Sequence, residues 1–266
     1  MPDADRELLI AALRDAGTIA RKYFGGRFKT FRKEGGDPVT EADLEIDSFL
    51  KGRLLAARPD YGWLSEESTD DPARLARART FVIDPIDGTY GFVKGRPQFT
   101  IVAAVVAEGR PVAAAVYNPI TDEMYEAAAK EGARKNGAKI RVSSQEEFAG
   151  ARFLATRGFL DPSRWAGPWP EGIGIETRSS IAYRMALVAE GAFDAMISLS
   201  RKSDWDLAAA DLIVQEAGGR VTTAENEKLL YNREAPVQGS VISAPPRLHE
   251  RLIARLKDYR PPSASD

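Results

Sequence analysis

Two aspartates interrupt an apolar, strand-like run in the segment TFVIDPIDGTYGFVKG at residues 80–95. Carboxylate oxygens are the ligands that hard divalent cations such as Mg²⁺ prefer. Asp84 and Asp87 are three residues apart across a tight turn, so both side chains can point to one place, and the carbonyl of Ile86 can supply a neutral ligand. Two or three metal ions that share carboxylates can bridge a phosphate and activate water. A plain Asp-Pro-Gly turn is the alternative interpretation.

The two residues after these aspartates favour an anion site. Gly88 and Thr89 begin a predicted short helix, where backbone N–H groups and the helix dipole attract negative charge. Gly88 has no Cβ, so a phosphate can approach the main chain. The sequence therefore predicts that the acids hold metal and that the next two residues bind the phosphate that the metal also contacts.

Three further acidic clusters each lie at the end of an apolar element: DPVTEAD with Asp43, WLSEES with Glu66 and Glu67, and SDWDLAAADL with Asp206. Each has a simpler structural interpretation. Thr40 and Asp43 fit a capping box, the two glutamates fit a solvated turn, and Asp206 fits a helix N-cap. The metal hypothesis is preferred because it accounts for all of these carboxylates together.

The composition excludes several other chemistries. The 266 residues are 44% hydrophobic and 29% charged, and the net charge of −2 gives no basic field for a nucleic-acid polymer or an anionic membrane. The absence of cysteine excludes disulfides, a thiolate nucleophile and cysteine-bound zinc. The single histidine, His249, is predicted to be a solvated side chain on a surface helix, which disfavours Ser-His-Asp and multi-histidine zinc chemistry.

The cellular location is predicted from two features that the sequence lacks, a signal peptide and a membrane span. The start of the chain, MPDADRELLI, is acidic and lacks the basic and apolar regions of a signal peptide. No apolar run approaches the roughly 20 residues of a membrane span. A cytoplasmic protein without a membrane partner is therefore expected.

The predicted elements divide the chain into two kinds of structure. The first half has two amphipathic helices, a strand that ends at the aspartates and successive antiparallel strands; the second half alternates strands and helices. The fold class is therefore α/β, with an α+β first half. The expected boundary separates an N-terminal part with most metal ligands (1–145) from a C-terminal α/β part with Asp206 and the substrate-side residues (146–266).

Four motifs occur in an order that resembles the inositol monophosphatase superfamily of Mg²⁺-dependent, lithium-sensitive sugar and nucleotide phosphatases. DPVTEAD matches its V-T-x-x-D element, and WLSEES its glutamate motif. DPIDGTYGF is similar to D-P-I/L-D-G-T, and DWDLAAADLIVQEAGG to the W-D motif that continues into E-A-G-G. The resemblance covers nearly the whole chain. It implies a layered αβαβα sandwich, two or three Mg²⁺ ions and a homodimer that acts on a small phosphorylated metabolite.

The resemblance also implies a ligand set. Glu66, Asp84 and the Ile86 carbonyl would hold one Mg²⁺. Asp84, Asp87 and Asp206 would hold a second, and Glu66 would help with a third.

The same resemblance implies roles in catalysis. Asp43 and Thr89 would orient and deprotonate the attacking water, while Gly88 and Thr89 would bind phosphate. Glu66 is counted among the catalytic residues because it would hold a metal ion. Lys33 stands where family members often carry a lysine on a mobile loop near the metals.

The departures from the family pattern concern the substrate. Leu199 stands where inositol-preferring members carry a glutamate that contacts ring hydroxyls. Arg201 and Lys202 follow it, and Ser180 and Arg184 lie in SSIAYRMALVAEG, which resembles the helix start of the bisphosphate nucleotidase branch. A cationic rim suits a second anionic group, such as the distal phosphate of 3′-phosphoadenosine 5′-phosphate. Solvated loop charges are the alternative, and inositol monophosphate and histidinol phosphate stay open as substrates.

Two other classes of protein are alternatives to this prediction. The aspartyl-phosphate phosphatases use D-x-D-G-T, which would need the nucleophilic aspartate at the position of Pro85. A regulatory protein that binds phosphorylated ligands without catalysis is the second alternative. All candidate ligands and Thr89 are intact, so an active phosphoric monoester hydrolase is preferred.

Overall fold

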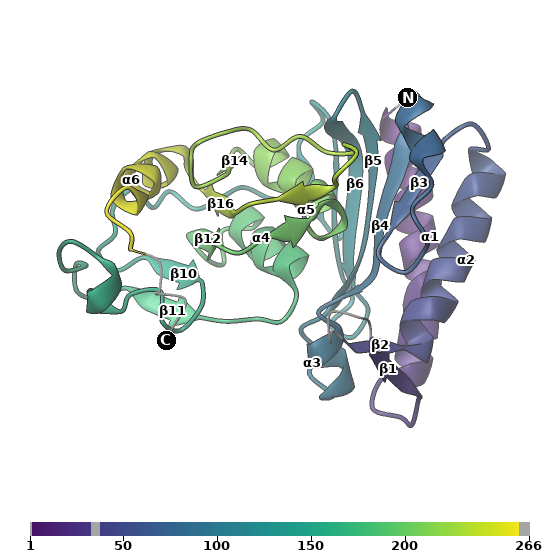
Figure 1. The fold of residues 1–266 in the computed structure, drawn as a ribbon, viewed down its shortest axis with the longest axis horizontal. Coiled ribbons are helices and arrows are strands. Elements are labelled where there is room, and N and C mark those ends of the chain that lie inside the picture. Colours follow the sequence, from purple (N-terminus) through teal and green to yellow (C-terminus); the bar gives the residue numbers. More distant parts are fainter. Residues whose placement is uncertain (1, 33–37, 261–266) are drawn as a thin grey trace.

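A computed structural model of the chain describes residues 2–32 and 38–260, and within them it has five layers (Figure 1). Helices, a large sheet, helices, a smaller sheet and a last helix follow one another. This is the αβαβα sandwich expected from the sequence, and the α/β fold class is confirmed. Among the described residues, no helix is both long and apolar enough to cross a membrane.

The first two layers are a helix pair and a seven-stranded sheet. Helices α1 (Pro2–Tyr23) and α2 (Glu41–Ala57) pack on one face of the sheet, whose strand order is β3-β4-β5-β6-β7-β8-β9. Strands β3 and β4 are parallel and every later pair is antiparallel, as predicted for the first half. The strands are β3 (Gly62–Ser65), β4 (Thr80–Asp87), β5 (Thr100–Ala107), β6 (Arg110–Asn118), β7 (Glu123–Ala128), β8 (Ala133–Lys135) and β9 (Ala138–Lys139).

Helical periodicity explains most of this packing. In α1 the apolar positions at steps of three and four, from Leu9 to Ala20, are fully buried against the sheet. In α2 the buried face is less regular, because Leu44 is 45% exposed while Asp47 is buried. The buried side of α2 thus carries carboxylates as well as aliphatic side chains.

The middle layer consists of α4 (Ile181–Ala189) and α5 (Asp204–Glu216), which lie between the two sheets. Both helices are buried on most sides, so they are apolar nearly all round. The run Ala208–Ala210 has no exposed surface, and these small side chains allow close approach of the flanking strands. The N-terminal ends of these two helices meet the end of β4.

The second sheet and α6 (Pro246–Leu256) form the last two layers. The strand order is β11-β10-β12-β16-β14, with parallel pairs at β10 and antiparallel pairs at β16. The strands are β10 (Arg152–Leu154), β11 (Gly174–Glu176), β12 (Ala195–Ser198), β14 (Arg220–Thr222) and β16 (Val241–Ala244). The remaining short elements are β1 (Thr30–Arg32), β2 (Pro38–Thr40), η1 (Pro72–Ala76), α3 (Thr89–Val93), η2 (Pro162–Arg164), β13 (Lys202–Ser203) and β15 (Val237–Gln238).

The two sheets begin and end on either side of the expected boundary at residue 145, since the first ends at Lys139 and the second begins at Arg152. One apolar cluster around α4 and α5 contacts both sheets. The division into two parts stays a prediction.

The expectation for His249 was wrong. Helix α6 lies on the surface, but His249 is fully buried and its Nε2 lies 2.9 Å from Thr222 Oγ1 in β14. His249 is one residue beyond Leu248 and three before Leu252, which places it on the helix face that packs on the sheet. It lies in the last layer, away from the acidic clusters.

Candidate metal centre

A β-bulge brings Asp84 and Asp87 to one face of the large sheet. Asp84 pairs with Val102 of β5 and Asp87 pairs with Thr100, so β4 has one more residue between these pairs than β5 has. Side chains alternate between faces in a regular strand, and the extra residue reverses that alternation. Ile86 turns to the opposite face, where its side chain is buried in the cluster under α1 and α2. The Asp-Pro-Ile-Asp sequence is therefore more than a turn.

The third carboxylate comes from α5. Oxygen atoms of Asp84, Asp87 and Asp206 lie within 4.8 Å of one another. Asp206 is the third residue of α5, and one of its oxygens accepts a hydrogen bond from Ser203 N at 3.0 Å. The helix-capping interpretation and the metal interpretation of Asp206 are compatible, since a carboxylate has two oxygens.

The N-terminus of α4 fixes the orientation of Asp87. Its Oδ2 accepts hydrogen bonds from Ser180 Oγ and Ala182 N, both at 2.6 Å, and its Oδ1 accepts one from Ile181 N at 3.2 Å. Ser180 is fully buried and its Oγ also lies 3.0 Å from Thr100 Oγ1. The structure thus corrects the expected substrate contact of Ser180, because its hydroxyl holds a candidate metal ligand and does not reach solvent.

The electrostatics of these carboxylates are those of a cation site. Burial, followed by the negative charges of Glu66, Asp87 and Asp206, raises the pKa of Asp84 well above its usual 3.8. Burial also raises the pKa of Asp206 to about 8 and that of Asp87 to about 6. Asp84 Oδ1 is buried without a hydrogen-bond partner among the described residues. A divalent cation would satisfy that oxygen and neutralise the repulsion, so this donor set fits Mg²⁺.

The glutamate motif lies next to this group. Glu66 directly follows β3, and its N–H donates to Ile83 O in β4 at 3.3 Å. It borders a cavity of about 430 Å³ together with residues from the start of α5 and from the short strands β13 and β15. The lining residues are Glu66, Arg201, Lys202, Ser203, Trp205, Asp206 and Val237. The structure therefore brings the motifs of Glu66 and Asp206 to one cavity.

Asp43 uses its two oxygens for two purposes. Thr40 N donates to Asp43 Oδ2 at 2.8 Å, which confirms the predicted capping box at the start of α2. The other oxygen, Oδ1, lies 3.2 Å from Thr89 Oγ1, which is also 2.9 Å from Ile86 O. Burial and the charge of Glu66 raise the pKa of Asp43 to about 6, against the effect of its hydrogen bonds. A carboxylate next to a hydroxyl at the edge of the acidic group can orient water and accept its proton.

Gly88 is required by backbone geometry. Its φ is +96°, in the left-handed region, and a Cβ there would lie 2.9 Å from Ser180 N and 3.3 Å from Gln98 O. The absence of a Cβ thus allows the main chain of Ser180 and Gln98 to pack closely against Gly88. This explanation for the glycine differs from the expected one, which was access for a phosphate. Helix α3 has only five residues, so its dipole adds little, and an anion here would depend on backbone N–H groups.

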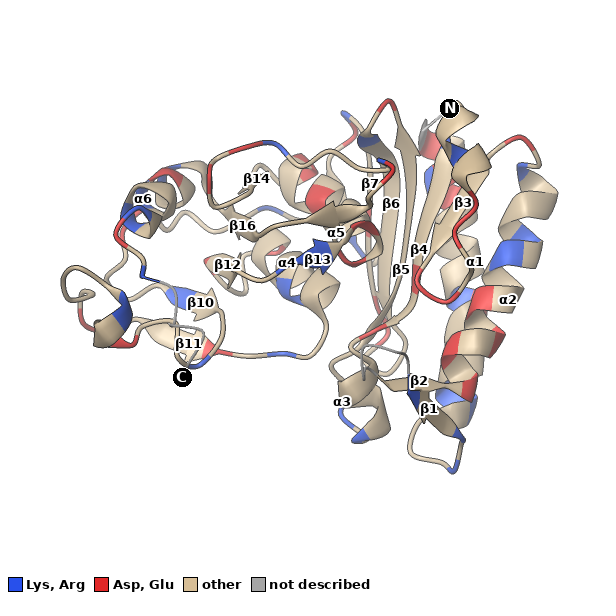
Figure 2. Cartoon of the chain, viewed as in Figure 1, with Lys and Arg blue, Asp and Glu red and all other residues tan. Residues whose placement is uncertain are grey.

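The basic residues differ in how closely they approach the carboxylates. Arg184 is half-buried on α4, where burial lowers its pKa and the charges of Asp87 and Asp206 act on it. Lys202 lies in β13, and its Nζ donates to Ser200 Oγ and to the carbonyl of Arg201, both at 3.0 Å. Figure 2 shows β13 as a basic segment on the side of the middle layer that faces the large sheet.

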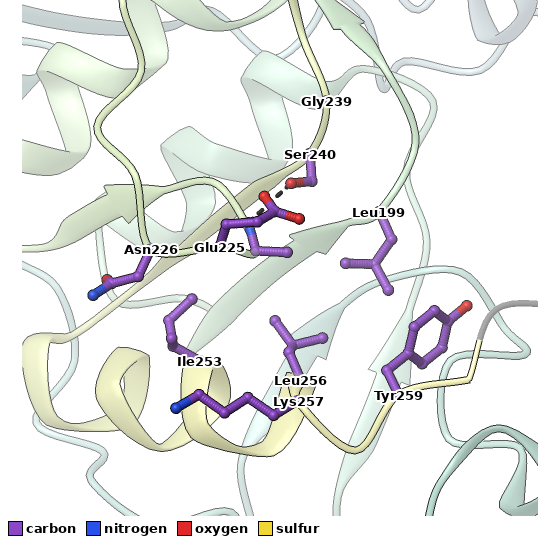
Figure 3. A pocket seen from close by; sticks show the side chains of 10 residues that line it. Leu199, Glu225, Asn226, Gly239, Ser240, Ile253, Leu256, Lys257 and Tyr259 are labelled. Carbon is purple, nitrogen blue, oxygen red and sulfur yellow. Dashed lines mark hydrogen bonds between the residues drawn. The ribbon is translucent and has the colours of Figure 1, made fainter.

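Leu199 lies in a different cavity from its basic neighbours. Its side chain points into a cavity of about 650 Å³ that Ile253, Leu256 and Tyr259 also line (Figure 3). Leu199 is absent from the residues that line the cavity next to Glu66 and Asp206. The interpretation that Leu199 removes a contact to ring hydroxyls stays a prediction, and the basic residues carry the rest of the argument about substrate choice.

Two further residues complete the comparison with the sequence predictions. Lys33 lies outside the described residues. Sequence reasoning gave no functional role to Asp47, which is buried on α2. Its signal was an acidic residue at a core spacing, four residues after Asp43, and the structure shows it hydrogen-bonded to the loop that carries Glu66.

Comparison with known proteins agrees with this geometry. The model of the "Inositol monophosphatase family" matches residues 2–260. The chain belongs to the inositol monophosphatase family. Among its relatives, an "Inositol-1-monophosphatase" of Rhizobium meliloti is 33% identical over 230 residues, which cover 82% of this chain and 85% of the relative. A "Nus factor SuhB" of Pasteurella multocida is 30% identical over 261 residues, 94% of each chain.

Solved structures of the family agree in fold. The extragenic suppressor protein suhB of Bartonella henselae superposes with a TM-score of 0.83 at 28% identity and covers 96% of this chain and 98% of its own. An IMPase of Thermotoga maritima gives a TM-score of 0.83 at 27% identity, with 97% of both chains covered. The names of these relatives include both phosphatases and a Nus factor. They support a phosphatase but do not identify its substrate.

Proposed function

We propose that the protein is a Mg²⁺-dependent phosphomonoesterase that hydrolyses a small phosphorylated metabolite. The observation that carries this proposal is the convergence of Asp84, Asp87 and Asp206 within 4.8 Å, with Asp84 Oδ1 buried and unpartnered among the described residues. A hydroxyl–carboxylate pair, Thr89 and Asp43, lies beside them. Metal ligands and a proton acceptor at one place are what phosphate-ester hydrolysis by water requires.

The proposed metal ligands follow the family pattern. Glu66, Asp84 and the Ile86 carbonyl would hold one ion, while Asp84, Asp87 and Asp206 would hold a second; Glu66 would contribute to a third. Bound Mg²⁺ supplies positive charge that neutralises the phosphate oxygens and lowers the pKa of water. The same resemblance supports sensitivity to lithium and a homodimer, and the cytoplasmic location predicted from the sequence is also part of the proposal.

The residues of the chain then position and deprotonate the nucleophile. Thr89 Oγ1 orients a water molecule and Asp43 accepts its proton, while backbone N–H groups of Gly88 and Thr89 hold the phosphate. The water oxygen forms a bond to phosphorus as the ester P–O bond breaks on the opposite side. The leaving alkoxide takes a proton from solvent, so the products are an alcohol and inorganic phosphate.

The substrate proposed is one with a second anionic group, such as a 3′,5′-bisphosphorylated nucleotide. Arg201 and Lys202 line the cavity next to Glu66 and Asp206, and Arg184 adds positive charge beside the carboxylates. A monophosphorylated polyol would leave these charges without a partner. Inositol monophosphate, which the names of several relatives suggest, and histidinol phosphate are the competing substrates.

Phosphate release from a panel of these substrates, with Mg²⁺ and with chelator, tests the proposal. We expect turnover that requires Mg²⁺ and no trapped phosphoenzyme. Chelator-resistant turnover or a phosphorylated aspartate would contradict the mechanism. No turnover of any substrate, combined with tight binding of phosphorylated ligands, would favour a regulatory protein, a possibility that the name "Nus factor SuhB" of several relatives raises.

A further inference from the structure

Asp47 contacts both ends of the loop that carries the glutamate motif. Its Oδ1 accepts a hydrogen bond from Ser65 Oγ at 2.5 Å, and its Oδ2 accepts one from Ser68 Oγ at 2.6 Å. Ser65 directly precedes Glu66, and Ser68 follows Glu67. One carboxylate on α2 therefore spans the short loop in which the two glutamates stand.

The site around Asp47 is buried and well connected. Asp47 is 7% exposed and Ser65 is 4% exposed, so the bonds between them are shielded from water. Trp63 Nε1 donates to Ser68 Oγ at 3.2 Å, which fixes this hydroxyl so that its own proton can go to Asp47. Charge-assisted hydrogen bonds in such surroundings are among the stronger ones in proteins.

Helix α2 connects this contact to the rest of the candidate centre. Asp43 and Asp47 are one helical turn apart and both are buried on the same side of α2. Asp43 faces Thr89, whereas Asp47 faces the loop of Glu66. The helix thus fixes the proton acceptor and the glutamate loop relative to each other.

We propose that Asp47 is a positioning residue for the metal centre, which holds the Ser65–Ser68 loop so that Glu66 is oriented toward Asp84 and Asp206. This inference rests on the proposed function, because it assumes that Glu66 is a metal ligand. Asp47 does not contact the metal or the substrate. It acts through the loop, which the hydrogen bond from Glu66 N to Ile83 O also joins to the sheet.

The expected effect is a loss of metal affinity. Removal of residues that orient metal ligands typically lowers affinity or activity by about 10-fold to 100-fold. We expect Asp47→Ala to weaken Mg²⁺ binding within this range. Asp47→Asn should keep most of the affinity, because an amide can accept one serine hydroxyl and donate to the other.

Titration calorimetry of the metal-free protein with Mg²⁺ measures this directly, without any turnover. The unmodified protein, Asp47→Ala, Asp47→Asn and Ser68→Ala are compared. Ser68 is half-exposed, so Ser68→Ala should fold normally and still weaken binding severalfold. In a double-mutant cycle, Ser68→Ala should add little once Asp47 is alanine, because both changes break the same contact.

Asp194→Ala is the matched control. Asp194 is 6% exposed, and its oxygens accept hydrogen bonds from Ser143 Oγ and Arg152 N, both at 2.7 Å, in the second sheet. Loss of this carboxylate removes a similar buried contact. It should lower the melting temperature of the metal-free protein and leave Mg²⁺ affinity unchanged.

The outcomes separate this inference from the proposed function. If the unmodified protein does not bind Mg²⁺, the proposed function is wrong and the inference is wrong with it. If the unmodified protein binds Mg²⁺ and both Asp47→Ala and Ser68→Ala bind it equally well, only the inference is overturned. Should Asp47→Ala fail to fold, the affinity of Ser68→Ala decides.

Discussion

Asp84 and Asp87 project their carboxylates to the same face of the large sheet, although residues three apart in a regular strand point to opposite faces. The extra residue of β4 between their partners, Val102 and Thr100, produces this arrangement. The bulge also directs both side chains toward the N-terminal ends of α4 and α5. The position of the candidate metal centre is thus set by one irregularity in an otherwise regular strand.

Asp84→Asn should separate activity from stability. The variant removes the carboxylate that would bridge two cations, so turnover should fall on the order of a hundredfold to a thousandfold, as for other preorganised electrostatic groups. The metal-free variant should melt at a higher temperature than the unmodified protein, because a buried like charge is lost. Phosphate release at saturating Mg²⁺ and a thermal melt in chelator measure the two effects. Near-normal activity would contradict the assignment of Asp84.

Thr89→Ala should lower kcat much more than it changes KM. The hydroxyl is proposed to orient the nucleophile in the transition state, whereas phosphate binding uses backbone N–H groups that alanine retains. Loss of a group that assists proton transfer typically costs about 10²–10⁴-fold. Thr89→Ser keeps the hydroxyl and is the control. If Thr89→Ala kept kcat and lost only affinity, Thr89 would be a binding residue.

Gly88→Ala should be strongly destabilising compared with Gly95→Ala. Both glycines have positive φ, but a Cβ at Gly88 would lie 2.9 Å from Ser180 N, while nothing lies within 4 Å at Gly95. We expect a loss of roughly 2–4 kcal/mol in the free energy of unfolding for Gly88→Ala, from backbone strain plus overpacking. Gly95→Ala should cost only about 1 kcal/mol. Urea unfolding compares them, and equal losses would contradict the close contact with Ser180.

Local sequence patterns predicted much of this molecule. The capping box at Thr40 and the buried positions of α1 follow from helical spacing, and the antiparallel order of the first half follows from short turns between apolar runs. The four acidic motifs are also local. Their sequence order and residue types predicted one metal centre, and the structure brings Asp84, Asp87 and Asp206 within 4.8 Å of one another, while the metal itself stays a proposal.

The features that local patterns did not predict depend on contacts between distant parts of the chain. Ser180 was expected at the substrate, but its hydroxyl packs against Asp87, 93 residues earlier. Leu199 stands only two residues from Arg201, yet the chain turns after β12 and directs Leu199 toward α6. His249 was expected in solvent because an amphipathic pattern does not give the width of the buried face. Such facts require the tertiary structure.

The free energy of unfolding should decrease as the pH falls from about 6.5 to about 4, because His249 is buried in its neutral form. Burial is the main cause that lowers its pKa from the ordinary 6.5 to about 4. Above pH 6.5 the imidazole is neutral in both states, and between these values only the unfolded chain binds the proton. The loss approaches roughly 3 kcal/mol at pH 4. The His249→Gln variant should not show this pH-dependent loss of stability. Urea unfolding of both proteins between pH 4 and pH 6.5 therefore measures the contribution of His249. Parallel pH profiles of the two proteins would contradict a buried neutral His249.

Replacement of Arg201 and Lys202 by alanine should reduce kcat/KM for a bisphosphorylated nucleotide and spare a monophosphate. Both residues line the cavity next to Glu66 and Asp206. A charge-assisted contact to a second phosphate contributes about 1.5–3 kcal/mol, or roughly tenfold to a hundredfold in rate. The control is the double alanine variant of Arg247 and Arg251, two exposed residues of α6 whose removal changes the net charge equally.

The control should leave both rates unchanged, because these exposed residues of α6 do not line the cavity and salt screens exposed charges. Equal losses on both substrates in the Arg201 and Lys202 variant would mean that these charges support the metal centre or the fold in general. A robust preference of the unmodified protein for inositol 1-phosphate would contradict the second anionic group. In that case Arg184, whose pKa the charges of Asp87 and Asp206 affect, would be the basic residue to examine for contact with the single phosphate.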